Sequence, residues 1–505
     1  MNNPIRRKVR KVLLIRPPAT IIKSVEPKSL AVPLGLAYLG AVLEDRYDVK
    51  ILDAMAEGYE NETLLADGTL RYGLSYEKIA ARIREFCPDV VGVSCLFSVQ
   101  FPNAIEVCRN IKKIDKEIIT IVGGSHPSAL PEEVLKEKEI DFVVIGEGER
   151  SLDEILTAIN TGADFAKIDG IAYRAGADIV VNQKTQYITD LDALPFPARH
   201  LLPMSTYFEV NRPHGSTSLK TPNTVMISSR GCPGKCVFCS IHTVWGKTYR
   251  ARSAENVLKE IEHLIRTYGI KEIQFGDDNL ILNKERARKI FQGMITKKMH
   301  LSWNAVGGVA LWRLDEELMK LMKESGCYRL SLPVESGDQY VLDAIIRKPV
   351  DLGSVRSVIA LAKKYHIKTD ALFVIGLPGE TRKMLQNTFN YARHLPVDNI
   401  NFFFATPFPG TDLLKICQEK GYLRPDFDYR HLRAGEVNIV TPEFTRQELE
   451  RLVAREALLF RLVLFFRDPR VFFERIVVRF FKDPRYFLNL VRKLLKTLFC
   501  KQTEA

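Results

Sequence analysis

The sequence predicts an α/β protein with two parallel-sheet domains in tandem, followed by a basic helical tail. Short apolar runs alternate with helical patterns from residue 12 to residue 146, and the same alternation resumes at Thr224. Continuous apolar strands separated by helices are typical of parallel sheets that helices cover on both faces. We therefore expect four regions: a doubly wound parallel-sheet domain at 1–150, a connecting segment at 151–222, a partial (β/α)6 barrel at 223–440 and a helical amphipathic region at 441–505.

The composition is that of a globular protein with room for two or three domains. Of 505 residues, 46% are hydrophobic and 27% are charged, which excludes a disordered chain. Six of the nine cysteines are scattered along the chain, as expected for reduced thiols rather than a disulfide framework. Since we find no apolar run long enough for a signal peptide or a membrane-spanning helix, we expect a cytoplasmic protein.

Five strands are predicted in the first domain, and their carboxyl ends should border a ligand crevice. The strands are Val12–Ile15, Val49–Leu52, Val90–Ser94, Ile118–Val122 and Phe142–Ile145. Glycine pairs follow the later strands, where they permit close approach of the backbone to a large planar or phosphate-bearing ligand. The dinucleotide-binding pattern G-x-G-x-x-G does not follow the first strand, so a dinucleotide is disfavoured.

The connecting segment is predicted to hold a helix, a short hairpin and then a linker rich in Pro, Ser and Thr. Six strand and helix units follow from Thr224, which suits an open barrel whose reactive residues lie at the carboxyl ends of its strands. The barrel strands are predicted at Thr224–Ser228, Glu272–Phe275, Leu301–Val306, Tyr328–Val334, Thr369–Ile375 and Asn399–Ala405.

Three cysteines lie within eight residues just after the first barrel strand. Cys232, Cys236 and Cys239 have the spacing C-x3-C-x2-C, and the next cysteine, Cys327, lies about 90 residues downstream. A structural zinc site is closed by four protein ligands. Three nearby cysteines therefore make zinc the less favoured interpretation. Three thiolates on a 4Fe–4S cluster, whose irons normally take four cysteines, leave one iron open to bind and reduce another molecule.

With the aromatic Phe238 just before the third cysteine, this motif resembles the signature of the radical S-adenosylmethionine (SAM) enzymes. The resemblance implies that the open iron chelates the amino and carboxylate groups of SAM and that reduction yields a 5'-deoxyadenosyl radical. It also implies SAM-binding roles at the carboxyl ends of later strands. Asp277 and Asp278 would accept from the ammonium and Glu335 from the ribose hydroxyls, and the turn at Gly376 would lie beside the adenine.

The first domain looks like a cobalamin-binding domain, the alternative being a generic flavodoxin-like domain. In the cobalamin family, a serine-x-leucine after the third strand and a glycine pair after the fourth flank the nucleotide tail of the cofactor. The motif Asp-x-His-x-x-Gly, whose histidine ligates cobalt, is absent after strand one, as in cobalamin-dependent radical enzymes. His126 is more typical of a loop hydrogen-bond partner than of a metal ligand. The cobalamin contacts implied by the resemblance are Ser94, Leu96, Gly123, Gly124 and Glu147.

The C-terminal tail is basic and contains a repeat. Phe465–Phe473 returns fifteen residues later as Phe480–Leu488, each with an Asp-Pro helix start. Residues 461–501 carry 11 Lys and Arg against 3 Asp and Glu, so 8 of the net +12 charges lie here. Such helices are typical of peripheral contact with an anionic membrane, here its inner face, and the alternative is a helical cap on the barrel. Because no binding motif accompanies the charge, we expect no nucleic acid.

We therefore expect a cobalamin-dependent radical SAM enzyme resembling the group of hopanoid methylases, bacteriochlorophyll methyltransferases and the anaerobic magnesium-protoporphyrin ester cyclase. The resemblance implies methylation of an unactivated carbon of an apolar lipid, hopanoid or tetrapyrrole, through a 5'-deoxyadenosyl radical and methylcobalamin. Ring closure or oxidation without methyl transfer is one alternative, and a corrinoid-binding sensor with a structural cluster is another. We also expect an electron donor such as flavodoxin or ferredoxin, and anaerobic conditions.

Overall fold

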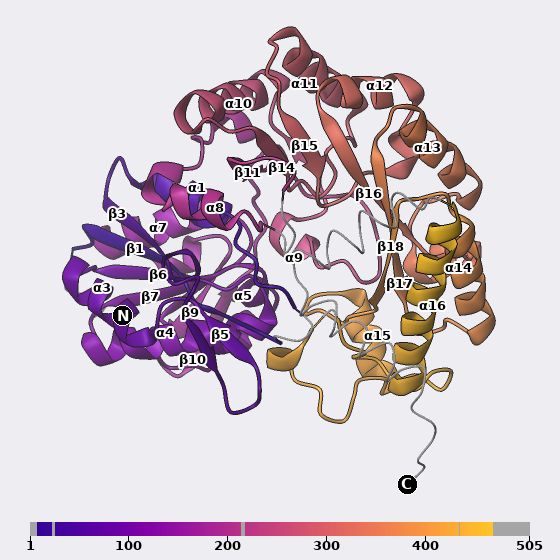
Figure 1. The fold of residues 1–505 in the computed structure, drawn as a ribbon. Helices are drawn as coiled ribbons and strands as arrows, with labels where there is room; N and C mark the ends of the chain where they lie inside the picture. Colours follow the sequence, from indigo (N-terminus) through magenta and orange to yellow (C-terminus); the bar gives the residue numbers. More distant parts are fainter. Residues whose placement is uncertain (1–7, 23–25, 214–217, 434, 468–505) are drawn as a thin grey trace.

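The computed structural model describes residues 8–22, 26–213, 218–433 and 435–467. Figure 1 shows two sheet domains side by side, the first in indigo to purple and the second in magenta to orange. Both sheets agree with the α/β fold class that the sequence predicts. The tail beyond residue 467, with most of the predicted repeat, lies outside the described residues.

The first sheet has seven strands in the order β10-β9-β8-β7-β6-β1-β3. The five predicted strands are confirmed, and they run parallel. Their order in the sheet places the second strand beside the first and the third on its other side, so the order reverses between β1 and β6, where such sheets bind ligands. The five strands are β1 (Lys11–Arg16), β3 (Asp48–Asp53), β6 (Val90–Ser94), β7 (Ile119–Gly123) and β8 (Phe142–Val144).

Helices cover both faces of this sheet because apolar side chains point alternately to each face. In β1, Val12 and Leu14 pack with the core under α1 (Leu34–Leu43) and α7 (Gly148–Thr161). Leu13 and Ile15 pack on the opposite side, under α3 (Tyr76–Phe86) and α4 (Phe101–Ile114). This is the doubly wound arrangement that the continuous apolar strands predict.

Two features of the first domain were not predicted. The hairpin expected in the connecting segment is present as β9 (Ile171–Ala175) and β10 (Asp178–Asn182), but it pairs antiparallel with β8 and extends the first sheet past residue 150. A separate antiparallel sheet contains β2 (Ala19–Ile21), β5 (Leu70–Tyr72) and β4 (Glu62–Leu64).

The second sheet contains six parallel strands in chain order, with β11 and β18 at its edges. The predicted partial (β/α)6 barrel is therefore confirmed. Its strands are β11 (Asn223–Met226), β14 (Glu272–Phe275), β15 (Ser302–Ala305), β16 (Cys327–Glu335), β17 (Lys368–Ile375) and β18 (Asn399–Phe404). The helices between them are α10 (Ala254–Tyr268), α11 (Lys284–Thr296), α12 (Glu316–Glu324), α13 (Leu352–Lys364) and α14 (Arg382–His394).

Each barrel helix begins at a polar residue whose side chain accepts a backbone N–H of the first turn, which fixes where the preceding strand-end loop stops. The capping residues are Ser253, Asn283, Asp315, Asp351 and Thr381. On the helix-covered face of the barrel sheet, Trp303 of β15 stacks on Phe291 of α11 at 4.8 Å between ring centroids. Shorter elements are α2 (Ala54–Glu57), α5 (Ser125–Ala129), α6 (Pro131–Leu135), α8 (Met204–Val210), β12 (Ser229–Arg230), α9 (His242–Trp245), β13 (Arg250–Ala251) and α15 (Asp412–Lys420).

The described part of the tail, α16 (Arg446–Arg467), packs on α14 and β18. Phe460 and Leu464 are buried in the barrel core, and the guanidinium of Arg467 donates to the carbonyl oxygen of Leu395 at 2.7 Å. This helix caps the barrel. Within the described ranges, no helix has both the length and the apolar character needed to cross a membrane.

Candidate functional site

The three cysteines lie on one loop between β12 and α9, at the carboxyl end of β11. We call residues 231–240 the cysteine loop. It begins at Gly231, whose φ of +79° and tight packing require glycine, since a Cβ would lie 2.4 Å from the carbonyl oxygen of Thr248. Val237 ties the loop to the barrel, because its N–H donates to the Ile346 carbonyl at 3.0 Å and its carbonyl accepts from the Leu413 N–H at 2.9 Å.

The thiols of the cysteine loop fit an iron–sulfur cluster by their chemistry and by the space between them. The absence of a side chain at Gly234 leaves space beside two of the thiols. A Cβ there would lie 3.3 Å from Cys232 Sγ and 3.9 Å from Cys236 Sγ. Burial raises the pKa of the Cys239 thiol to about 11 and also raises that of Cys236, whereas a coordinated thiol is deprotonated outright. In the described part of the chain, no three Cys, His, Asp or Glu side chains lie close enough together to hold a single metal ion. A 4Fe–4S cluster does not need such a group, because each cysteine ligates a different iron.

The structure distinguishes the two predicted aspartates at the end of β14. Asp277 is buried and accepts from the N–H and hydroxyl of Ser228 and from the hydroxyl of Ser229, at 2.5 to 3.2 Å. Asp278 accepts from the Gly231 N–H at 3.2 Å. Burial, and then the charge of Asp277, raise the pKa of Asp278 to about 7. A cation bound beside Asp278 would favour its ionised form, whereas the oxygens of Asp277 already hold the end of β11.

Glu335 lies at the end of β16, beside a register shift in the strand. Its φ of +69° is rare for a residue with a side chain and costs of order 1–3 kcal/mol, so the surrounding contacts must hold it there. One such contact is an ion pair with Lys348 at 2.6 Å, in which both side chains are about nine-tenths buried. Lys348 follows Ile346 by two residues, and the Ile346 carbonyl accepts from the N–H of Val237 in the cysteine loop, so the pair lies next to this loop.

Gly376 opens the turn after β17 with a φ of +78°. The carboxylate of Glu380 closes this turn by accepting from the N–H groups of Gly376 at 2.7 Å and Leu377 at 3.2 Å. Glu380 is fully buried, and its Oε1 has no partner among the described residues. Burial raises the pKa of Glu380 to about 7 despite the two donors. Phe238 is half-buried against the same barrel core.

The predicted cobalamin contacts Ser94, Gly123 and Gly124 come together at the carboxyl ends of β6 and β7, where Ser94 and Gly123 are register partners. Gly124 has a φ of +118°, and a Cβ there would lie 2.4 Å from the carbonyl oxygen of Cys95. Leu96 and Phe97 follow β6 and are 51% and 63% exposed. Large exposed apolar side chains at the carboxyl end of a parallel sheet are typical of a ligand-binding surface.

His126 follows this glycine pair but is buried. Its Nδ1 lies 2.9 Å from Ser98 Oγ, and its ring packs against Phe101 at 4.5 Å between centroids. Burial lowers the pKa of His126 to about 4, so the ring is neutral. These contacts agree with the expected role of a loop hydrogen-bond partner.

Glu147, the fifth predicted cobalamin contact, is fully buried, and both of its carboxylate oxygens accept hydrogen bonds from other groups of the protein. Its Oε1 accepts from Arg230 at 2.9 Å and from Arg250 at 2.7 Å, and its Oε2 accepts from the N–H of Ile188 at 2.8 Å. Sequence reasoning missed both arginines because isolated charges usually indicate solvated surface. The signal that could have found them is the pair of acids, Glu147 and Glu149, directly after a buried strand.

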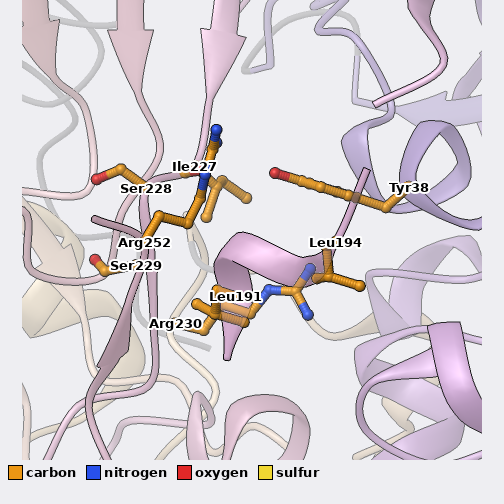
Figure 2. Close-up of a pocket in the computed structure, with 8 residues that line it drawn as sticks. All are labelled: Tyr38, Leu191, Leu194, Ile227, Ser228, Ser229, Arg230 and Arg252. Carbon is orange, nitrogen blue, oxygen red and sulfur yellow. The ribbon is translucent and has the colours of Figure 1, made fainter. Parts of the chain in front are cut away.

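A small cavity lies between the two domains, and Figure 2 shows Tyr38 of α1 pointing toward Ile227 and Arg252 across it. Its volume of about 10 Å³ admits at most one water molecule. A larger pocket, of about 640 Å³, opens between α2 and α8. Neither pocket is lined by a predicted cofactor ligand.

Comparison with known proteins identifies both domains. Residues 24–156 match the B12 binding domain, and residues 226–392 match the radical SAM superfamily. The radical SAM methyltransferase TsrM of Kitasatospora setae, solved with a tryptophan substrate and a SAM analogue, has the same fold with a TM-score of 0.70. The alignment covers 89% of each chain at 16% identity.

Sequence alignments with named relatives cover both domains. Cytidylyl-2-hydroxyethylphosphonate methyltransferase of Streptomyces wedmorensis is 34% identical over 84% of this chain and 85% of its own length. An uncharacterized methyltransferase of Pyrococcus horikoshii is 33% identical over 90% and 93%. The anaerobic magnesium-protoporphyrin IX monomethyl ester cyclase of Rubrivivax gelatinosus is 28% identical over 83% and 71%. The hopanoid C-3 methylase of Methylococcus capsulatus is 25% identical over 75% and 67%.

The two matched domains account for both predicted cofactor regions, the cysteine loop and the crevice at β6 and β7. The identity to methyltransferases extends over most of the chain and most of each relative. The chain therefore belongs to the cobalamin-dependent radical SAM methyltransferase family, whose members use cobalamin, a 4Fe–4S cluster and SAM.

Proposed function

We propose that the protein methylates an unactivated carbon of an apolar substrate held between the cysteine loop and the crevice of the first domain. The observation that carries this proposal is the contact between the segments that follow the two regions in the chain. Helix α5, which follows Gly124, contacts α9, which follows Cys239. The turn after β8 is equally close, since a Cβ at Gly146 would lie 3.1 Å from the carbonyl oxygen of Val244. The carboxyl ends of both sheets thus border one region.

The bound cofactors supply the radical and the methyl group, and the side chains hold them. In this proposal, Cys232, Cys236 and Cys239 ligate the cluster. Asp278 rather than Asp277 accepts from the SAM ammonium. Asp277 Oδ1 already accepts from the hydroxyls of Ser228 and Ser229, and both of its oxygens accept from the Ser228 N–H.

The other strand ends complete the two cofactor sites. Glu335, oriented by Lys348, accepts from the ribose hydroxyls, and the turn at Gly376 and the ring of Phe238 border the nucleoside. Ser94, Leu96, Gly123 and Gly124 contact cobalamin. Glu147 does not belong to this set, because its carboxylate is taken by Arg230 and Arg250. The sequence predicts that the first domain ends at residue 150, but we propose that it extends to residue 182, since β9 and β10 join its sheet, and that the barrel begins at residue 223 as expected.

An apolar substrate is supported by exposed apolar side chains near both cofactor regions. Leu96 and Phe97 are exposed at the end of β6, and Phe403, near the end of β18, is 43% exposed. Relatives whose names give tetrapyrrole and hopanoid substrates point the same way. Ring closure without methyl transfer is the alternative chemistry, since one of these relatives is a cyclase. A corrinoid sensor does not agree with membership of an enzyme family.

A polar substrate is the second candidate, and two amide groups favour it. Gln274 and Asn304 are register partners on β14 and β15, on the face opposite the helix-covered Ile273 and Trp303. The Asn304 amide nitrogen donates to the hydroxyl of Tyr328 at 2.9 Å. Gln274 Oε1 and Asn304 Oδ1 are buried and lack partners among the described residues. The relative of Streptomyces wedmorensis also carries the name of a charged substrate.

The test is anaerobic reconstitution with cluster and cobalamin, followed by SAM carrying a deuterated methyl group and cell extract divided into apolar and polar fractions. Mass spectrometry should find the label in a product of the apolar fraction. Label confined to the polar fraction would favour the second candidate. A product that has lost hydrogen without gaining label would favour ring closure or oxidation.

The proposal includes peripheral contact with the inner face of the membrane and an external electron donor such as flavodoxin or ferredoxin, in an oxygen-poor cell. Leu462, Val463 and Phe466 are exposed near the end of α16, and the basic repeat continues beyond them. The full chain should sediment with anionic liposomes, and a chain ending after Arg467, which loses most of the basic repeat, should sediment far less. The truncation must spare α16, because Phe460 and Leu464 belong to the barrel core. Equal sedimentation of both chains would contradict membrane contact by the tail.

A further inference from the structure

The turn after β8 and the strand that leads into the cysteine loop are joined by buried charges. Arg230, two residues before Cys232, donates to Glu147 at 2.9 Å and to Glu149 at 2.6 Å. Arg250 donates to the same oxygen of Glu147 at 2.7 Å. All four side chains are less than 10% exposed. The two acids belong to the first domain and the two arginines to the second.

Arg230 and Arg250 lie directly opposite each other in the antiparallel pair of β12 and β13. Like charges at such a position repel each other, and burial strengthens the repulsion because water no longer screens it. The carboxylate of Glu147 accepts from both guanidinium groups and so balances this pair. The strand pair next to the cysteine loop therefore depends on an acid that the first domain supplies.

Of the other contacts of the two arginines, the one with Tyr38 reaches the first domain, the one with Ile188 reaches the connecting segment, and those with Trp245 stay within the second domain. The guanidinium of Arg230 lies 5.2 Å from the ring centre of Tyr38, on α1, and 4.7 Å from that of Trp245, on α9. Figure 2 shows Arg230 and Tyr38 on opposite sides of the small cavity. Arg250 donates to the carbonyl oxygen of Trp245 at 2.8 Å and to that of Ile188 at 2.6 Å.

Buried ion pairs add little to stability compared with apolar packing, because removing charges from water costs about as much as their attraction returns. Their best-supported use is to select one arrangement of the parts they join. Paired guanidinium–carboxylate contacts suit this use because they are directional.

We propose that Glu147 is a positioning residue that fixes the carboxyl edge of the first sheet relative to the cysteine loop, with Arg230 as its principal partner. The inference rests on the proposed function for the identity of the two cofactor sites that Glu147 would align. A radical formed at one site must act on a substrate carbon that the other site can reach, so a small change in their separation matters.

The first test uses the cofactor-free full chain and hydrogen–deuterium exchange. In Glu147→Gln, amides around Ile188 and along β12 and β13 should exchange at least tenfold faster, while those of β6, β7, β16 and β17 keep their wild-type rates. Arg230→Lys should give the same pattern, because a single ammonium group cannot replace the two guanidinium nitrogens that donate to Glu147 and Glu149. A uniform rise over the whole chain, or no change in either variant, would overturn the proposal.

Glu260→Gln is the matched control. Glu260, on α10, is also fully buried and also accepts from two guanidinium groups, those of Arg199 and Arg252. Neither arginine comes from the first sheet. Its effect on exchange should stay around α10 and the connecting segment and leave the amides of the turn after β8 unchanged.

The second test measures the separation of the two cofactors by pulsed electron double resonance between cob(II)alamin and the reduced cluster. The distance distribution should be narrow in wild type and in Glu260→Gln, and broader or shifted in Glu147→Gln. Loss of cobalamin binding with unchanged exchange rates would instead make Glu147 a direct cofactor ligand and overturn the proposal. If wild type itself takes up no cluster or cobalamin, the proposed function fails, and the exchange experiment still decides whether Glu147 joins the domains.

Discussion

The buried carboxyl of Glu380 should make the barrel less stable as pH rises toward neutrality. Burial raises its pKa from 4.5 to about 7. A raised pKa in an acid means that the folded state binds the proton more tightly than the unfolded state. The cost is therefore absent below about pH 4.5, develops up to about pH 7 and stays constant above it. At 1.36 kcal/mol per pKa unit, the shift corresponds to about 3 kcal/mol.

Replacing Glu380 with Gln removes the cost of burying an ionised carboxylate and preserves the turn after β17. The amide oxygen can accept from Gly376 and Leu377, as Oε2 does now. The variant should match wild type near pH 4 and exceed it by up to about 3 kcal/mol at pH 8. For a urea slope near 3 kcal/mol/M, the midpoint then rises by about 1 M.

The assay is urea unfolding of cofactor-free protein at several pH values, followed by tryptophan fluorescence. The chain has three tryptophans, Trp245, Trp303 and Trp312, and all lie in the barrel region. Other titrating groups are common to both proteins, so the difference between the two curves isolates residue 380. Exposed Glu419→Gln is the control and should follow wild type throughout. Parallel curves for Glu380→Gln and wild type would refute the reasoning.

Three further predictions concern the cofactor sites. Replacing the three cysteines of the loop with Ala should abolish iron–sulfur absorption, and a variant that still binds four irons per chain would contradict the assignment. Lys348→Met should destabilise the protein by about 3–5 kcal/mol in thermal or urea unfolding, because it leaves the carboxylate of Glu335 buried without a partner. Adding Glu335→Leu should restore much of the loss, and an unchanged loss would argue against the pair. Bound cob(II)alamin should show no splitting from an axial nitrogen in electron paramagnetic resonance. His126 is held by Ser98 and Phe101, so such a splitting would mean that it leaves those contacts.

The sequence predicted the parallel strands of both sheets because each is a continuous apolar run next to a helical pattern. It did not predict β4, whose three residues Glu62–Leu64 are all exposed and carry no apolar alternation. It also could not show that the hairpin of β9 and β10 would join the first sheet, since the hairpin pattern is the same whether or not its edge is paired.

In the candidate site, too, features set by a short stretch of sequence could be predicted, whereas contacts between residues far apart in the chain could not. The turns at Gly124 and Gly376 could be predicted, because positive φ values and close packing call for glycine in the sequence itself. The separate roles of Asp277 and Asp278 could not, because neighbouring carboxylates look alike until Ser228 and Ser229 occupy one of them. The pair of Arg230 and Glu147 joins residues 83 positions apart, and no local pattern reports such a contact.

The most direct test of the central conclusion is the fate of SAM in the anaerobically reconstituted, reduced protein. Liquid chromatography with mass spectrometry should detect both 5'-deoxyadenosine, from reductive cleavage, and S-adenosylhomocysteine, from methyl donation. Both should be absent when the variant with the three cysteines replaced by Ala is prepared without cobalamin. A protein that holds cluster and cobalamin in full amounts but forms neither product would contradict the assignment as a radical SAM methyltransferase.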